Sequence, residues 1–235
     1  SVTFGGAVGG TTPLASLTVD TDNVALTAIQ VGGNISTDGA APDVALNAPV
    51  TLTGNTTIDT DATQDANAAG AVTFGSTLDG NRTLSIDASG QGTDSGGQVT
   101  FAAAVGGNTS LTSLAVTTDR AGADSILLGD VTTGGAQSYA GLITLNDAAS
   151  VLTTTNNNVT FSAAVTDGGG SSSLQVSAGT GTVALGGNVT ADNGFTVGGA
   201  TGTLRVDGNL TIDTSAGAGA VDINGSIDAN TIDTE

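Results

Sequence analysis

Aspartate carboxylates are the only abundant groups in this sequence that could do chemistry. The 235 residues include 22 Asp or Glu and three Arg, but no His, Lys or Cys. Asp20 and Asp22 stand two residues apart, as do Asp59 and Asp61. On a strand such pairs project from one face roughly 7 Å apart, and Ca²⁺ favours roughly six to eight oxygen ligands. These four are candidate calcium ligands, with a hydrated acidic surface that keeps molecules soluble as the alternative.

Other chemistries find little support. The missing His and Cys exclude Ser-His-Asp and Cys-His nucleophiles. Neither the glycine-rich calcium repeat of toxins nor the EF-hand loop occurs, and the GGN segments lack the strand–helix context of a phosphate loop. We therefore expect no cofactor other than calcium, and no enzyme activity.

A polysaccharide-degrading enzyme is the remote alternative. The fold that the repeats predict, as argued below, is a parallel β-helix, and pectin lyases and polygalacturonases have that fold. The segment STDG at 36–39 matches one polygalacturonase motif. The paired aspartates, the histidine and the basic cluster that such enzymes also use are missing. Two carboxylates can still cleave a glycoside, but the chain offers few aromatic platforms for a sugar.

The charge balance limits the partners. A formal net charge of −19 repels nucleic-acid phosphates and anionic lipid headgroups. No apolar run approaches the roughly 18 residues of a membrane-spanning helix. We expect neither nucleic-acid binding nor membrane insertion, and the absence of Cys favours an extracellular location.

Internal repeats dominate the organisation of the chain. Residues 2–22 and 99–119 match at fourteen of twenty-one positions without a gap, and Val-Thr-Phe begins at Val2, Val72, Val99 and Val159. The long repeat is about a hundred residues, covering 2–98, 99–182 and a partial copy at 183–235 of a single segment, 1–235.

Short apolar alternation within the repeats predicts β-strands. Val, Ile, Leu and Thr recur with period two in runs of three to six residues, separated by Gly- and Asn-rich turns, and no helical stretch is found. We expect the Ala-rich segment 65–71 to be a loop, and Tyr139 to be a packing residue. The expected strands include 17–19, 24–26, 50–52, 142–145, 204–206, 210–212 and 221–223.

Aromatic residues form only 3% of the chain, too few to fill the gap of roughly 10 Å between the sheets of a sandwich. A parallel β-solenoid instead stacks each strand about 4.8 Å from its copy and needs only small side chains inside. The sequence predicts an all-β, right-handed parallel β-solenoid, or β-helix. Roughly 20 to 30 residues per turn would place Phe4, Phe74, Phe101 and Phe161 in interior ladders.

Strings such as VTFGGAVGGTTPLASLTV at 2–19, GGAQSYAGLITL at 134–145 and GTVALGGNVTADNGFTV at 181–197 resemble repeats of very large bacterial surface proteins. These are the filamentous-haemagglutinin-like and autotransporter-like adhesins. The resemblance covers essentially the whole chain. It implies a right-handed β-solenoid, export, and a role in adhesion or in an extracellular fibre.

Two functions follow as expectations. The chain is a structural segment of a secreted or cell-surface fibre, able to self-assemble by end-to-end stacking of open coils. Alternatively, it is a ligand-binding adhesin module, in which loops at 61–70 or 90–98 contact a glycan or a protein receptor.

Overall fold

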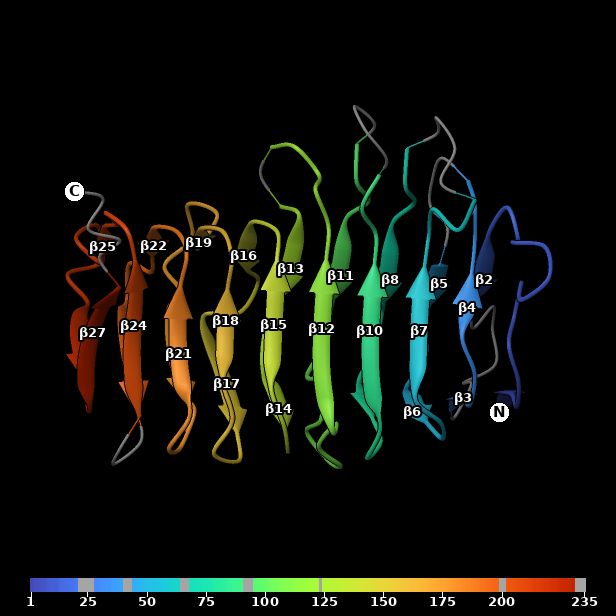
Figure 1. Cartoon of the computed structure of the whole chain (residues 1–235), viewed down its shortest axis with the longest axis horizontal. Helices are drawn as coiled ribbons and strands as arrows, with labels where there is room; N and C mark the ends of the chain where they lie inside the picture. Colours follow the sequence, from blue (N-terminus) through green and yellow to red (C-terminus); the bar gives the residue numbers. More distant parts are fainter. Residues whose placement is uncertain are drawn as a thin grey trace.

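The computed structural model is a right-handed parallel β-solenoid (Figure 1). It describes residues 1–20, 28–39, 44–63, 68–90, 95–122, 124–198 and 202–230. Within these ranges there are only strands and turns, and every strand pair is parallel. The front strands in Figure 1 run upward while the chain advances from right to left, which makes the winding right-handed. The predicted fold class is confirmed.

Three flat faces enclose the core, and each turn of the chain visits face C, then face A, then face B. Face A holds β1 (Val2–Phe4), β3 (Ile29–Val31), β6 (Val50–Leu52), β9 (Leu78–Asp79), β14 (Val131–Thr133), β17 (Ala149–Thr154), β20 (Ser173–Ser177), β23 (Gly194–Gly198) and β26 (Ala220–Ile223). Single-residue bridges of Val105 to Leu78 and to Val131 join the two halves of this face.

Faces B and C are continuous nine-stranded sheets within the described residues. Face B holds β4 (Ile35–Ser36), β7 (Thr56–Asp59), β10 (Thr83–Asp87), β12 (Ser113–Thr117), β15 (Gln137–Ala140), β18 (Val159–Phe161), β21 (Thr182–Leu185), β24 (Thr203–Asp207) and β27 (Ser226–Asn230). Face C holds β2 (Leu17–Val19), β5 (Val44–Leu46), β8 (Val72–Phe74), β11 (Val99–Phe101), β13 (Ile126–Leu128), β16 (Ile143–Leu145), β19 (Val165–Thr166), β22 (Val189–Thr190) and β25 (Ile212–Asp213).

The core consists of ladders in which like residues stack from turn to turn. Along face C the pairing register stacks Val44, Val72, Val99, Ile126, Ile143, Val165 and Val189, each at most 1% exposed. Alternation with period two turns every second side chain inward, so β-branched residues suit these strands. Nine turns at about 4.8 Å give a rod about 40 Å long.

The aromatic residues occupy separate ladders. The rings of Phe74 and Phe101 stack on face C with centroids 5.4 Å apart, and those of Tyr139 and Phe161 stack on face B at 5.7 Å. Phe195, which is not part of a Val-Thr-Phe triplet, is also fully buried. The interior placement is confirmed for Phe74, Phe101 and Phe161, whereas Phe4, on the outermost strand of face A, is only half-buried.

The predicted strands recur with small shifts: the structure has Ile143–Leu145 for 142–145 and Ile212–Asp213 for 210–212. The strand expected at 24–26 lies outside the described residues. The packing role predicted for Tyr139 is confirmed, because its ring is fully buried.

Turn length divides the rod into two halves. Successive face C strands begin 27 or 28 residues apart as far as β13, and 17 to 24 residues apart afterwards. The change falls where a polar pair enters the core: the Tyr139 hydroxyl donates to Gln137 Oε1 at 3.0 Å, and Gln137 Nε2 donates to the Thr153 carbonyl at 2.9 Å. The N-terminal half of the rod therefore uses more residues for each turn than the C-terminal half.

Candidate functional site

The corner between faces B and C in the N-terminal half carries three loops that connect successive turns of the rod. The described parts of the loops that follow β7, β10 and β12 rise side by side above the strands in Figure 1; they are residues 60–63, 68–71, 88–90, 95–98, 118–122 and 124–125. Two of these loops contain the segments 61–70 and 90–98 that the sequence predicts as protruding loops. We call the described parts of the three loops the loop edge.

An Ile-Asp-Thr pattern, residues 58–60, closes the first of these loops. Asp59 Oδ1 accepts the Asp61 N–H at 3.1 Å, and Thr60 Oγ1 donates across the loop to the Gly70 carbonyl at 2.8 Å. The same bonds recur after β25, where Asp213 accepts the Ser215 N–H and Thr214 donates to Gly219. Side-chain bonds to nearby backbone groups suit Asp and Thr to turns. These residues are therefore explained by loop closure.

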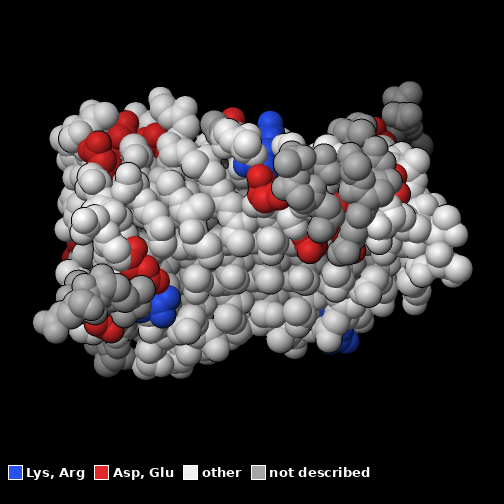
Figure 2. Space-filling model, turned by 45° about the horizontal axis from the view of Figure 1, so that its top comes forward, with Lys and Arg blue, Asp and Glu red and all other residues white. Residues whose placement is uncertain are grey.

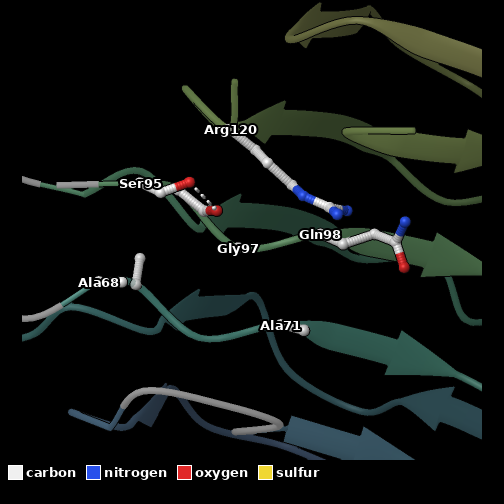
Figure 3. Close-up of a pocket in the computed structure, with 8 residues that line it drawn as sticks. Ala68, Ala71, Ser95, Gly97, Gln98 and Arg120 are labelled. Atoms are coloured by element: carbon white, nitrogen blue, oxygen red, sulfur yellow. Dashed lines mark hydrogen bonds between the residues drawn. The ribbon is translucent and has the colours of Figure 1, made fainter. Parts of the chain in front are cut away.

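The loop edge contains a pocket of about 340 Å³, shown in Figure 3. Its described lining is small and mostly uncharged, with one guanidinium: Ala68, Ala69, Ala71, Ser95, Gly96, Gly97, Gln98 and Arg120. Arg120 Nη1 and Gln98 Nε2 both donate to the Asp124 carbonyl, at 3.0 and 2.7 Å. That shared acceptor fixes the two polar side chains relative to one another.

The glycines in the pocket are there because the loops approach each other closely. A Cβ at Gly97 would overlap the Gly70 carbonyl of the preceding loop. A Cβ at Gly96 would lie 2.7 Å from the backbone nitrogen of Arg120 in the following loop. Close backbone approach of this kind is reserved for glycine. The pocket can bind a small polar group by hydrogen bonds, and its described lining includes no carboxylate that could act as acid or base.

Arg120 is the one charged residue in the described lining of the pocket, and the sequence did not single it out. The three arginines of the chain differ in their partners. Within the described residues only Arg205 forms an ion pair, with Asp207 at 2.9 Å. Arg82 and Arg120 donate instead to backbone carbonyls. No signal in the local sequence distinguishes Arg120, because its position depends on the stacking of distant loops.

Three of the four candidate calcium ligands, Asp20, Asp59 and Asp61, lie in the described part of the chain. Asp59 projects from the end of β7 and is half-buried, whereas Asp61 lies beyond the strand end, 5% exposed, and bridges to Asp38. Asp20 is exposed at the end of β2, and Asp22 lies outside the described residues. Over the described ranges no group of three possible metal ligands forms.

In two separate groups of aspartates, neighbouring carboxylates shift the pKa of one member of the group. Burial and then the charges of Asp87 and Asp38 raise the pKa of Asp59, against the backbone bond from Asp61. Desolvation and then the charges of Asp167 and Asp213 raise the pKa of Asp192. Bonds from Ser215 lower the pKa of Asp213. Figure 2 shows acidic side chains near the loop edge and over the C-terminal turns, with a few basic side chains on the same face.

Fold and site together define an acidic, all-β repeat protein of the parallel β-solenoid class. Comparison with family models, with curated proteins and with solved structures found no match to this chain. The described residues include no helix with the length and hydropathy needed to cross a bilayer.

Proposed function

We propose that this chain is a structural repeat segment of a secreted or cell-surface bacterial fibre or adhesin. The observation that supports this best is the continuity of the ladders. Faces B and C each hydrogen-bond nine successive turns, and the core is built from repeated small side chains. Such a quasi-one-dimensional architecture extends by adding turns. A rod with this design provides reach and stiffness.

Immunoelectron microscopy tests this placement. Antibodies raised against residues 1–235 are expected to label fibres or the outer surface of intact source cells. An antibody against a cytosolic protein is the control and should label only permeabilised cells. Labelling by the anti-rod antibody that also requires permeabilisation would refute the proposal.

End-to-end association is supported by the last described turn. Val221 and Ile227 are 47% and 62% exposed, although their positions belong to the interior ladders below Phe195 and Leu204. Sedimentation velocity at rising concentration should show growing assemblies, which the double variant Val221→Lys, Ile227→Lys abolishes. The control Ser138→Lys alters an exposed position in the middle of face B. A chain that stays monomeric throughout would contradict this part.

The pocket at the loop edge supports a second candidate, a ligand-binding adhesin module for a surface glycan or protein. On a glycan array, Arg120→Ala should remove any binding. The matched control is Arg82→Ala, whose guanidinium also donates to backbone carbonyls but lies on another corner. Equal binding by both variants and the parent would exclude the pocket.

A further inference from the structure

Eight asparagines are followed two residues later by Ser or Thr, with no proline between, which is the acceptor pattern for N-linked sugar. The chain has 16 Asn, and Ser and Thr make up 59 of its 235 residues, so about four such triplets would arise by composition alone. All eight asparagine side chains are exposed. They are Asn34, Asn55, Asn81, Asn108, Asn158, Asn188, Asn209 and Asn224.

The strand alternation presents both recognition residues of a triplet to the outside. In the triplet at 158–160, Asn158 is exposed, Val159 is fully buried, and Thr160 lies on the outer side of β18. The triplet at 188–190 repeats this arrangement around the buried Val189. The central residue anchors the triplet in the core, while the Asn side chain is exposed and the Thr side chain is partly exposed.

Four of these amides are also held in one orientation. Their Oδ1 atoms accept backbone N–H groups of the following turn: Thr57 to Asn34 at 3.0 Å, Thr83 to Asn55 at 3.1 Å, Thr182 to Asn158 at 2.9 Å and Thr211 to Asn188 at 2.9 Å. Within the described residues their Nδ2 atoms make no hydrogen bond. By contrast, Asn108 and Asn224 donate Nδ2 to Asp79 and Asp222.

We propose that the rod is N-glycosylated at Asn34, Asn55, Asn158 and Asn188. The donor is a sugar diphosphate, carried on a nucleotide or on a lipid. Nδ2 attacks the anomeric carbon, forming the N–C bond; the bond from that carbon to the diphosphate oxygen breaks, and the diphosphate leaves with the electron pair. The proton lost from Nδ2 passes to a base of the transferase. The sugars would form a hydrated layer along the corners of face B.

Asn156 provides a matched control within the same loop. Like Asn158 it is exposed, and its Oδ1 accepts an N–H of the following turn, from Thr180 at 3.1 Å. The residue two places on is Asn158 for Asn156 and Thr160 for Asn158, so only Asn158 has the acceptor pattern. The intervening residue differs as well, and Asn156 has a φ of +57°. If exposure alone determined modification, both would be modified.

Peptide mass spectrometry of the chain isolated from its source cells is the test. Sugar is expected on Asn158 and not on Asn156. Thr160→Ala should abolish occupancy at Asn158 and Thr160→Ser should retain it. Alanine already occupies this register in neighbouring turns, at Ala115 and Ala184, so the fold tolerates the change. A purified chain treated with uridine-diphosphate glucose and a soluble N-glycosyltransferase, or with lipid-linked oligosaccharide and a membrane oligosaccharyltransferase, identifies the donor.

Unmodified asparagines in the native chain, or sugar on Asn156 as often as on Asn158, would overturn the proposal. Occupancy that survives Thr160→Ala would overturn it as well. The proposed fibre role is tested separately, because surface labelling does not depend on sugar. Glycosylation can therefore fail while the fibre proposal stands, and the reverse.

Discussion

Residues 2–22 and 99–119 match at fourteen of twenty-one positions, yet the strands that they contain lie on different faces of the rod. The copy at 2–22, called the outer copy because it lies at the end of the rod, begins on face A with β1 and ends on face C with β2. The copy at 99–119, called the inner copy, begins on face C with β11 and ends on face B with β12. From β1 the chain returns to face A at β3, β6 and β9, and then passes β10 to reach β11. The copies are therefore separated by three and two-thirds turns.

The corners of the two copies are nonetheless built alike. Gly9 and Gly106 have φ of +72° and +70°. Leu14 N–H donates to the Ser36 carbonyl at 3.1 Å, and Leu111 N–H donates to the Thr132 carbonyl at 3.3 Å. The repeated unit is thus two strands and the connection between them, which crosses the intervening face at the single-residue bridge of Val8 or Val105. Any of the three faces accepts it, because each offers the same inward–outward alternation.

Burial is what separates the copies energetically. In the inner copy Val99, Phe101, Val105, Leu111, Leu114 and Val116 are all at most 1% exposed. Their counterparts in the outer copy are half-buried, apart from the buried Val19, because β1 pairs with a strand on one side only. Identical substitutions in the two copies therefore measure the contribution of the second neighbouring turn.

The largest difference is expected at the two phenylalanines. Phe101→Ala removes a ring that is stacked on Phe74 and should lower the free energy of unfolding by about 3–5 kcal/mol. Phe4→Ala removes a half-buried ring from an edge strand, and about 1 kcal/mol is expected. Equilibrium denaturation compares them, with hydrogen exchange to locate the loss. Equal losses would show that the end turns are packed as tightly as the middle.

A smaller difference is expected at the corner glycines. An added Cβ at Gly106 would overlap the Thr132 carbonyl oxygen, and one at Gly9 would overlap that of Ser36, both at positive φ. Gly106→Ala should cost about 1–3 kcal/mol. Gly9→Ala should cost less, because the end turn can open locally and relieve the strain. Amide exchange near Leu111 and Leu14 reports each effect, and greater loss at Gly9 would contradict the comparison.

The repeats predicted the class of fold but not the face that each copy occupies. Alternation at 17–19 or 50–52 identifies strands, and the scarcity of aromatic residues favours a solenoid over a sandwich. Face assignment depends on how many residues each loop uses, and loop length carries no period. For the same reason the pocket was not predicted: Gln98 and Arg120 meet only because two long loops stack. Asp59 and Asp61 were taken for one strand face, whereas the strand ends at Asp59.

The stability of the turn next to the inner copy should depend on alkaline pH, because Tyr139 of that turn stacks directly on Val116 of the inner copy. Burial raises the pKa of this tyrosine, the only one in the chain, far above its ordinary value. The folded state therefore retains the proton after the unfolded state has lost it. The contribution of Tyr139 to stability should be constant below about pH 10 and be lost as the pH rises further.

Phenolate absorbance provides a direct readout, since no other tyrosine contributes. Ionisation should coincide with unfolding rather than precede it. Tyr139→Phe should remove this alkaline loss and cost about 1 kcal/mol at pH 7, because Gln137 Oε1 loses its donor. Ionisation of Tyr139 in the folded rod near pH 10 would show that the ladder above the inner copy is open to water.

The smallest effect tests a position at which the copies differ in charge. Asp20 of the outer copy corresponds to Thr117 of the inner copy, and Thr117 stacks on Asp87, which in turn stacks on Asp59. Thr117→Asp would extend this carboxylate row by one turn. Like charges directly opposite each other destabilise parallel strands, so about 0.2–1 kcal/mol should be lost at pH 7.

The loss should disappear in acid. The pKa of Asp59 is already raised, so the folded state binds a proton at higher pH than the unfolded state, and this group favours folding more as pH falls. A third carboxylate should raise that pKa further, which carboxyl NMR titration measures. Thr117→Asn is the uncharged control and should leave both stability and the Asp59 pKa unchanged. A loss that persists at pH 3, or one shared by Thr117→Asn, would mean that packing, not charge, keeps an aspartate out of the inner copy.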